Sequence, residues 1–411
     1  MFIINFQEGD KMKKLILIII ILLFISNVNA LDLSSRHVVL YNMNEDKIIY
    51  ELEKDEKTSI ASLTKIMTTL VAIENIDNYN ETVTLYDSMF TGLAEANAAV
   101  IGLKSGQIVT YNDLLYGMFI ASGADATRAI AISISGLESS FVELMNKKAK
   151  ELGMNNTNFV NTTGLDKDNQ YSTVNDVAIL LKEALKNEKF KEIFIASEYT
   201  FTDQSLTIKN TLRKTALTYG YDVNYIKGAK TGFTYDAGKC LASIATDTKN
   251  NIEYLLVTTN ADTSTKDAYH VKDAVTLYNY YFEHYKYHNL VDKDDLVLTL
   301  PTKYGKTDSI NIYANEDITY YLDNNFNKEN VTLQYNGINE VTTSMEKGTK
   351  LGYINILYNG EVLKKMDVYL LEKVEFSMLV FLKENINYVI LAILFVVLIL
   401  LEVIIKRKSK S

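Results

Sequence analysis

The chain of 411 residues contains one cysteine, one proline and no tryptophan. Because Cys240 has no second cysteine to pair with, an internal disulfide bond is excluded. The chain must therefore be held together by packed cores, and a stretch of about 250 residues is long enough to form one. The scarcity of proline and tryptophan, together with many Asn, Lys, Ile and Tyr residues, indicates an AT-rich genome and carries no structural information.

Positive charge is outnumbered by negative charge, because the chain has 42 Lys and Arg against 51 Asp and Glu residues and a formal net charge of −9. Basic residues gather near both ends, so the central body is more acidic than the whole. An acidic body argues against binding to nucleic acid or to anionic polymers. It still allows a local basic pocket for a small substrate.

The first thirty residues are typical of a secretory signal rather than of a folded element. Basic residues between Lys11 and Lys14 precede an apolar run from Leu15 to Ile25, and small residues follow up to Ala30. We expect cleavage after Ala30. The alternative is a retained N-terminal anchor, for which the apolar run is short.

The other end of the chain predicts a membrane span. Tyr388 to Ile405 is an apolar stretch of 18 residues interrupted only by Glu402, and as a helix it would extend roughly 27 Å. The basic residues that follow it favour a cytoplasmic tail, because positive charge stays on the cytoplasmic side. The catalytic body would then be extracytoplasmic. The alternative, a buried C-terminal helix, fits poorly with a helix that is apolar on all sides.

Between these ends the chain contains two regions with different sequence patterns. Strand-like segments lie near 37–50 and 240–259, with helical periodicity between them and after them, which predicts an α+β domain with one antiparallel sheet and a helical cluster. The helical segments are expected at 62–76, 111–134, 141–152, 173–185 and 266–285. From residue 286 onward, short alternating runs separated by turn residues predict a small all-β domain. The predicted layout is a signal peptide at 1–30, a catalytic domain at 31–285, a β-rich domain at 286–372, a linker at 373–387, a transmembrane anchor at 388–405 and a cytoplasmic tail at 406–411.

Three short motifs occur in a characteristic order. They are Ser-Leu-Thr-Lys at 62–65, Ser-Gly-Ala at 122–124 and Lys-Thr-Gly at 230–232. This ordered triple is typical of β-lactamases and penicillin-binding proteins. From about His37 to Tyr285 the chain resembles the D-alanyl-D-alanine carboxypeptidases, the low-molecular-weight penicillin-binding proteins of the serine β-lactamase-like superfamily. The resemblance implies an α/β (α+β) fold of the transpeptidase type.

Elementary chemistry supports a nucleophile at Ser62. On a helix Ser62 and Lys65 are three positions apart and share a face. Lys65 could take the serine proton only if its pKa were lowered, which burial and a second cation such as Lys230 would achieve. N–H groups at the start of the helix would also stabilise developing negative charge.

The remaining roles come from the resemblance. It implies that Ser122 passes a proton to the leaving amine, and that Lys230 and Thr231 bind the carboxylate of the terminal D-alanine. The N–H groups of Ser62 and Phe233 would form the oxyanion hole. The predicted catalytic residues are Ser62, Lys65 and Ser122, and the predicted substrate-binding residues are Lys230, Thr231, Gly232 and Phe233.

One residue departs from the family pattern. Ala124 stands where the family usually has an asparagine, so an amide that would hold Lys65 and the substrate carbonyl is missing. The loss of such a hydrogen bond could cost about 1–3 kcal/mol. The neighbouring Asp125 is expected to point elsewhere on its helix.

Two further patterns help to choose among enzyme classes. The segment from Phe159 to Tyr171 lacks the Glu-x-x-Leu-Asn pattern of class A β-lactamases, whose glutamate activates the deacylating water.

His284 and His288 are four apart on a predicted helix, a spacing that could bind metal, but a partly exposed helix face is the better interpretation. No metal or organic cofactor is expected.

These observations predict a membrane-anchored, extracytoplasmic serine carboxypeptidase that trims the terminal D-alanine of peptidoglycan stem peptides and is acylated by β-lactams. The alternatives are a DD-endopeptidase or a β-lactamase on the same fold, or a catalytically weak protein that binds the cell wall. Ala124 is the feature that permits the last alternative. The intact serines and lysines of the three motifs argue against it.

Overall fold

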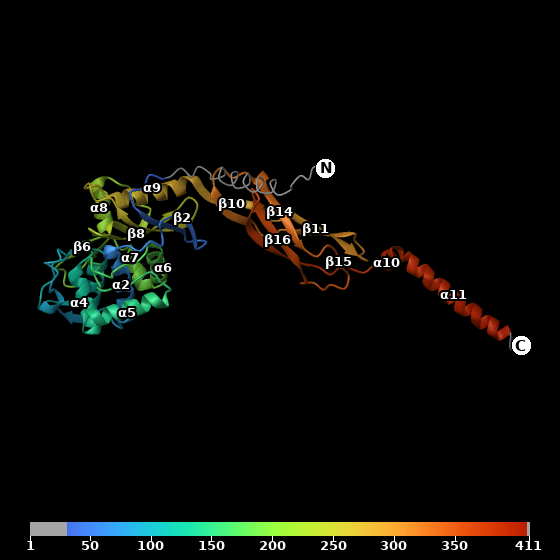
Figure 1. The fold of residues 1–411 in the computed structure, drawn as a ribbon, viewed down its shortest axis with the longest axis horizontal. Coiled ribbons are helices and arrows are strands. Elements are labelled where there is room, and N and C mark those ends of the chain that lie inside the picture. Colours follow the sequence, from blue (N-terminus) through green and yellow to red (C-terminus); the bar gives the residue numbers. More distant parts are fainter. Residues whose placement is uncertain (1–30, 409–411) are drawn as a thin grey trace, which may run out of the picture. The chain divides into compact units, whose positions relative to one another are not determined.

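The structure, a computed structural model, describes residues 31–408. The predicted signal peptide lies outside the described residues. Within them the chain forms two compact units that divide between Glu283 and His284. Each unit has its own hydrophobic core, and the chain can be followed by colour in Figure 1.

The first unit is organised around a sheet in which every neighbouring pair of strands is antiparallel. In spatial order the five strands are β2 (Lys47–Leu52), β1 (His37–Asn42), β9 (Ile252–Ala261), β8 (Gly238–Asp247) and β7 (Ile226–Thr234). The hairpin predicted near 37–50 is confirmed as β1 and β2. Among the described strands, β7 has a neighbour on one side only, so its outer edge can accept an extended ligand.

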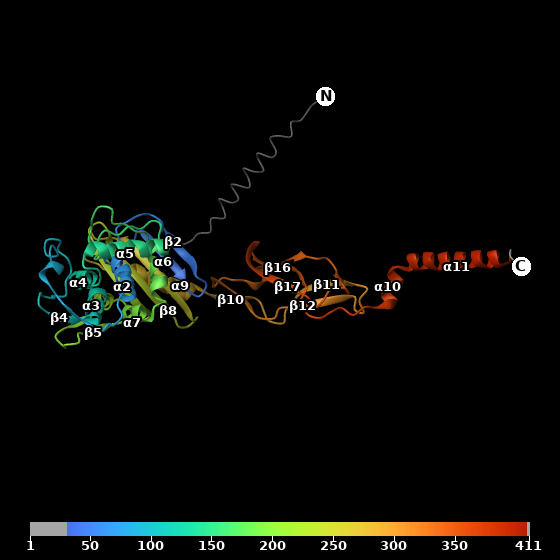
Figure 2. The same ribbon diagram turned by 90° about the horizontal axis from the view of Figure 1, so that it is seen from below.

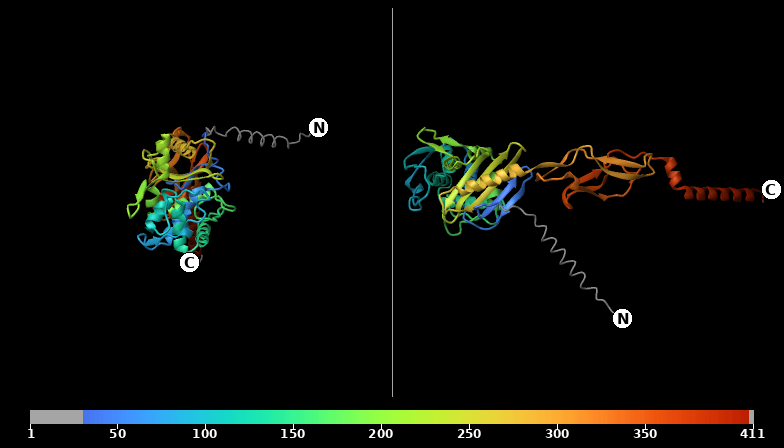
Figure 3. Two further views of the ribbon diagram at one scale, coloured as in Figure 1. Left: turned by 90° about the vertical axis from the view of Figure 1, so that its left-hand side faces the viewer. Right: turned by 90° about the horizontal axis from the view of Figure 1, so that it is seen from above.

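Helices cover both faces of this sheet, as Figures 1 and 3 show. On one face lies α9 (Tyr269–His284), where the Tyr278 hydroxyl lies 2.9 Å from the Ser243 hydroxyl of β8. The other face supports the helical cluster α2 (Thr64–Glu74), α3 (Tyr111–Phe119), α4 (Ala124–Ser135), α5 (Glu138–Glu151), α6 (Val174–Ala184) and α7 (Glu188–Ile195). Helix α8 (Thr211–Tyr219) contacts the edge strand β7. Two small hairpins pair β3 (Thr82–Thr84) with β4 (Ile108–Thr110) and β5 (Glu198–Thr200) with β6 (Thr207–Lys209).

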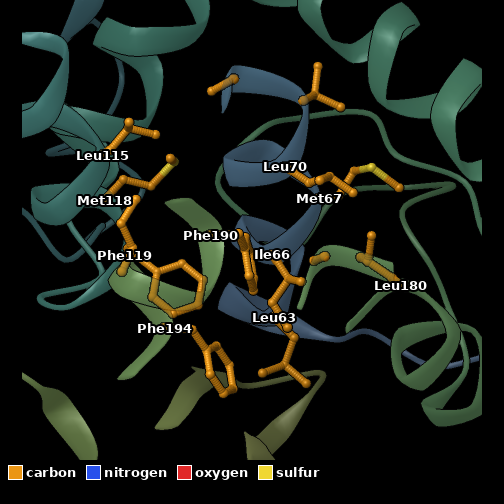
Figure 4. Packing of buried hydrophobic residues seen from close by; sticks show 14 of the residues in the cluster. Leu63, Ile66, Met67, Leu70, Leu115, Met118, Phe119, Leu180, Phe190 and Phe194 are labelled. Carbon is orange, nitrogen blue, oxygen red and sulfur yellow. The ribbon is translucent and has the colours of Figure 1, made fainter. Parts of the chain in front are cut away.

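Helix α2 lies at the centre of the cluster. Every residue from Thr64 to Ile73 is buried, so the helix is enclosed on all sides. Figure 4 shows its leucine, isoleucine and methionine side chains between Phe119 of α3, Phe190 and Phe194 of α7, and Leu180 of α6. A fully packed helix fixes the position of the turn that precedes it, the 3₁₀ turn η1 (Ala61–Leu63).

The second unit begins as an all-β structure, coloured orange in Figure 2. Its strands form three small sheets, with hydrophobic side chains such as Ile354, Ile356 and Val341 in a common core. The strands are β10 (Tyr285–Val291) with β13 (Ile318–Asp323); β12 (Ser309–Tyr313) with β11 (Leu296–Lys303) and β15 (Val341–Thr342); and β14 (Val331–Gly337) with β16 (Lys350–Tyr358) and β17 (Glu361–Tyr369). Two helices follow, α10 (Met378–Glu384) and α11 (Ile386–Lys408).

The predicted fold class is confirmed, with a mixed α+β catalytic unit, an all-β segment and an apolar C-terminal helix. Two details of the prediction are wrong. The helical segment expected at 111–134 is broken between Phe119 and Ala124. His284 and His288 do not share a helix, because α9 ends at His284 and His288 lies in strand β10.

The aromatic cluster beneath α2 should contribute strongly to stability. Phe119 is 1% exposed, and its ring centroid lies 5.5 Å from that of Phe190 and 5.7 Å from that of Phe194. We predict that Phe119→Ala lowers the free energy of unfolding by about 3–5 kcal/mol, because it leaves a cavity that the cluster cannot fill. The control Leu217→Ala, at a position 86% exposed, should change it by less than about 0.5 kcal/mol. Denaturant unfolding measures both, and equal effects would contradict this account of the core.

Candidate active site

Ser62 occupies a strained turn at the start of α2. The residue before it, Ala61, has a φ of +47°, a left-handed conformation that non-glycine residues seldom adopt. Such strain is retained only where the surroundings fix the backbone. The turn presents Ser62 to a cleft of about 620 Å³.

Two glycines allow the chain to close around this turn. A Cβ atom at Gly164 would lie 1.9 Å from the Ala61 carbonyl oxygen, and one at Gly232 would lie 3.0 Å from the Ser62 nitrogen. Gly164 also has a φ of +83°. The glycine of the Lys-Thr-Gly motif is therefore needed because β7 passes directly beside the Ser62 backbone.

Lys65 is the group best placed to take a proton from Ser62. Its Nζ atom lies 3.0 Å from the Ser62 Oγ atom and donates a second hydrogen bond to the Thr163 carbonyl oxygen at 2.6 Å. Burial lowers the pKa of Lys65 to about 7, although the Asp125 carboxylate opposes this shift. A substantial fraction of Lys65 is therefore neutral near neutral pH, as a general base requires.

A second serine–lysine pair joins Ser122, which lines the same cleft, to Lys230 behind it. The Lys230 ammonium group, fully buried, donates hydrogen bonds to the Ser122 Oγ atom at 2.9 Å and to the Thr231 carbonyl oxygen at 2.7 Å. Burial and the charge of Lys65 hold the pKa of Lys230 well below its usual value. Ser122 has a φ of +61°, so it too lies in a strained turn, between α3 and α4.

The edge strand β7 forms one wall of the cleft. Its Thr231, Gly232 and Phe233 line the cleft together with Ser62, Lys65 and Ser122. The Thr231 hydroxyl lies 2.6 Å from the Thr211 hydroxyl of α8, and Phe233 is 52% exposed at the rim. The structure thus brings six of the predicted site residues to one cleft, while Lys230 lies behind it and contacts Ser122.

Ala124 also lines the cleft, at the first turn of α4. Its N–H group donates to the Ala99 carbonyl oxygen at 2.7 Å. Asp125 points away, as expected, since its carboxylate accepts hydrogen bonds from the N–H groups of the loop residues Ile101, Gly102 and Leu103. The missing amide would have two roles, to hold Lys65 and to contact the substrate carbonyl. The first role is filled here by the Thr163 carbonyl oxygen.

Several lining residues were not predicted from the sequence. Thr163 contributes a backbone carbonyl, which any residue type could supply, so its side chain gives no signal. Lys239 and His270 come from β8 and α9, and isolated residues of these types carry no motif. Within residues 31–408 no group of three His, Cys, Asp or Glu side chains is arranged to hold a metal ion.

Comparison with known proteins adds independent information. A family model described as D-alanyl-D-alanine carboxypeptidase matches residues 25–263, and one described as the C-terminal domain of penicillin-binding protein 5 matches residues 285–376. The chain is 32% identical to the D-alanyl-D-alanine carboxypeptidase DacF of Bacillus subtilis over 81% of its own length and 84% of that protein. It is 30% identical to the D-alanyl-D-alanine carboxypeptidase DacC of Escherichia coli over 85% of its length and 86% of that protein.

Solved structures agree with the fold. Penicillin-binding protein 5 of Haemophilus influenzae matches with a TM-score of 0.59 and 24% identity, covering 84% of this chain and 98% of that one. The D-alanyl-D-alanine carboxypeptidase DacD of Francisella tularensis matches with a TM-score of 0.64 and 20% identity, covering 84% and 95%.

The contact between Ser62 and Lys65 leads to a prediction about the pH dependence of acylation. With Lys65 as the base, the rate of Ser62 acylation by a penicillin should be low at acidic pH and rise as the pH passes through about 7. Lys65→Arg should lower the rate by about 10² to 10⁴, because a guanidinium group keeps its proton. Stopped-flow measurements across this range test both. A rate independent of pH, or an active arginine variant, would exclude Lys65 as the base.

The missing amide leads to a second prediction. Ala124→Asn should raise the acylation rate constant by up to about tenfold, if about 1.4 kcal/mol of transition-state stabilisation is regained through the substrate carbonyl. The same stopped-flow assay compares the two proteins. An unchanged or lower rate would mean that the cleft already compensates for the absent amide.

Proposed function

The chain belongs to the D-alanyl-D-alanine carboxypeptidase family, and we propose that it removes the terminal D-alanine of peptidoglycan stem peptides through an acyl-enzyme on Ser62. It is a serine-type carboxypeptidase of the low-molecular-weight penicillin-binding proteins. The observation that carries the proposed mechanism is the 3.0 Å contact between Ser62 Oγ and the Lys65 Nζ atom, whose pKa is lowered to about 7.

The first chemical step is acylation. Neutral Lys65 takes the proton of Ser62 as the Oγ atom bonds to the carbonyl carbon of the penultimate D-alanine. The carbonyl oxygen becomes an oxyanion, and the N–H groups of Ser62 and Phe233 are proposed to stabilise it. The substrate backbone lies along the outer edge of β7, where strand hydrogen bonds would align it.

Release of D-alanine follows from the second serine–lysine pair. As the C–N bond breaks, the leaving nitrogen takes the proton of the Ser122 hydroxyl. Lys230, which contacts the Ser122 Oγ atom at 2.9 Å, stabilises the serine oxygen during this transfer. The proton that Lys65 gained can then return Ser122 to its neutral form. Water attacks the acyl-enzyme in turn, with neutral Lys65 as its base, and restores Ser62.

The carboxylate of the substrate lies at the Thr231 end of the cleft in this proposal. A β-lactam presents a similar carbonyl and carboxylate, so we expect it to acylate Ser62 as well. The DD-endopeptidase and β-lactamase alternatives are not favoured by the family. No cofactor takes part in the proposed steps, and peptidoglycan rather than nucleic acid is the proposed polymeric partner.

The proposed location is the outer face of the cytoplasmic membrane. Helix α11 has a stretch from Ile386 to Lys406 that is long and apolar enough to span a bilayer, and none of it is buried. Basic residues after the stretch favour an inside tail. We therefore propose the layout predicted from the sequence, with the catalytic domain at 31–285, the β-rich domain at 286–372, a linker at 373–387 and the anchor at 388–405.

Product analysis tests the proposed reaction. Incubated with a peptide ending in D-Ala-D-Ala, the protein should release one equivalent of free D-alanine, and Ser62→Ala should lower the rate by at least about 10³, as for loss of a catalytic nucleophile. Chromatography of the products measures this. Release at the same rate by Ser62→Ala, or cleavage confined to cross-linked peptides, would contradict the proposal.

Truncation tests the anchor. A chain that ends before Ile386 should be found in the soluble fraction and should still bind penicillin, because the apolar stretch of α11 is gone while the catalytic unit is intact. Cell fractionation with a fluorescent penicillin measures both properties. If the shortened chain stays in the membrane fraction after a carbonate wash, another segment anchors the protein.

A further inference from the structure

The cleft has a second wall that is almost entirely made of alanine. In addition to β7, the cleft is lined by the loop segment Ala96–Ala99 and by Ala124 of α4. The two segments adjoin, because the Ala124 N–H group donates to the Ala99 carbonyl oxygen at 2.7 Å. Four of these five residues are alanines, and the fifth is Asn97. This surface, formed by residues 96–99 and Ala124, is called the alanine wall, and Asn97 carries its one polar side chain.

The Asn97 carboxamide is available to bind a ligand. Asn97 is exposed, and its side chain makes no hydrogen bond to another residue within the range 31–408. Among the residues that line the cleft, it is the one with a carboxamide, which can both donate and accept hydrogen bonds. A peptide group of a substrate has the same two kinds of atom, so the two groups are complementary.

The loop that carries Asn97 is fixed to the start of α4. The Asp125 carboxylate, in a residue that is 2% exposed, accepts hydrogen bonds from the N–H groups of Ile101, Gly102 and Leu103. A buried carboxylate needs such partners, so this contact holds the loop firmly. The position of Asn97 in the cleft is therefore set by the helix that also carries Ala124.

Asn97 occupies a left-handed turn, with a φ of +48°. Its N–H group donates to the Ala94 carbonyl oxygen at 3.0 Å, and the Ala98 N–H group donates to the Leu93 carbonyl oxygen at 2.9 Å. These two hydrogen bonds have the pattern of a Schellman motif. Asparagine tolerates this conformation better than most residues, so a purely conformational role is the competing explanation. Glycine would fulfil that role equally well, but it would supply no amide.

An extended substrate would present a carbonyl group to the alanine wall. In the proposed acylation the carbonyl oxygen of the penultimate D-alanine faces β7, because the Phe233 N–H group contributes to the oxyanion hole. In a strand the N–H and C=O groups of one residue point to the same side, and those of the next residue point to the other side. The carbonyl of the residue before the penultimate D-alanine therefore faces away from β7.

From this arrangement we propose that the Asn97 carboxamide donates a hydrogen bond to that carbonyl oxygen and holds the acyl side of the substrate against β7. The inference rests on the proposed function, because the position of Ser62 identifies which carbonyl is meant. Asn97 thus supplies from the loop a contact that the methyl group of Ala124 cannot make from α4. It is a substrate-binding residue, while the chemistry stays with the serine–lysine pairs.

The test uses two β-lactams that differ in this carbonyl group. Benzylpenicillin has an acylamino side chain whose carbonyl corresponds to the one that Asn97 would bind, and 6-aminopenicillanic acid has the same ring system without the acyl group. Asn97→Gly keeps the left-handed turn and removes the carboxamide. Asn97→Asp keeps the size of the side chain and replaces the donor with an acceptor. The matched control is Asn359→Gly, at a φ of +50° in the turn between β16 and β17.

With the full chain, we expect Asn97→Gly to lower the second-order rate constant for acylation by benzylpenicillin by about threefold to tenfold, the range for one neutral hydrogen bond. Asn97→Asp should lose at least as much. Acylation by 6-aminopenicillanic acid should show no such loss, which also shows that the variants are folded. Asn359→Gly should behave as the wild type with both compounds. Stopped-flow measurements give all of these rate constants.

A double substitution tests whether Asn97 and an amide at position 124 serve the same carbonyl. Ala124→Asn should raise the rate of acylation by benzylpenicillin more in the Asn97→Gly background than in the wild type. The reason is that the new amide then replaces a contact that has been lost, rather than adding to one that is present.

Four outcomes would overturn the inference. These are an unaltered rate with benzylpenicillin in Asn97→Gly, an equal loss with both β-lactams, an Asn97→Asp protein as active as the wild type, or an equal gain from Ala124→Asn in the two backgrounds. If benzylpenicillin acylates Ser62 of the wild type, any of these results refutes the role of Asn97 alone. If the wild type forms no acyl-enzyme with either compound, the proposed function fails and the inference falls with it.

Discussion

Removal of water from the Lys65 ammonium group is the constraint on which the rest of the catalytic unit depends. Helix α2 is buried from Thr64 to Ile73, and among the described residues the Lys65 ammonium group contacts the Ser62 hydroxyl and the Thr163 carbonyl oxygen. A charge with so little solvation is disfavoured, so burial lowers the pKa of Lys65 to about 7, the range that the proposed general base needs. Burying this group costs free energy, and the packing of the core around α2 must offset that cost.

Close packing around the Ser62 turn follows from the same constraint. The loop at Gly164 and the strand at Gly232 approach the turn so closely that a side chain at either position would collide with the backbone or press against it. Ala61 and Ser122 are held in left-handed conformations on the two sides of the cleft. Local strain of this kind is common where a functional group must be held in a fixed direction. Exclusion of water and rigid placement of Ser62 are thus two consequences of one packing arrangement.

Much of this organisation could be predicted from the sequence. The ordered motifs identified the superfamily, and alternating or helical periodicity located β1, β2, α5, α6 and the all-β segment. Helices α7 and α8 were missed, since a helix of eight or nine residues gives few repeats of its period. The His284–His288 interpretation failed because the periodicity of α9 gives no sign of the change to strand β10.

Other features of the site depend on contacts between distant segments and had no local signal. The Thr163 carbonyl oxygen reaches Lys65 only because the loop folds over α2. His270 lines the cleft although it lies on α9, far along the chain from the three motifs. The resemblance implies that Lys230 binds the substrate carboxylate, and this role stays a prediction, whereas its contacts with Ser122 and the Thr231 carbonyl oxygen had no signal in the sequence.

The most direct test of this account is the identity of the residue that forms the covalent intermediate. Intact-mass and peptide mass spectrometry of the protein after brief exposure to a penicillin should show one adduct per chain, on the peptide that contains Ser62. A Lys65→Arg protein treated in the same way should stay almost unmodified, because the serine keeps its proton. An adduct on any other residue, or one that persists in Ser62→Ala, would contradict the central role given to the Ser62–Lys65 pair.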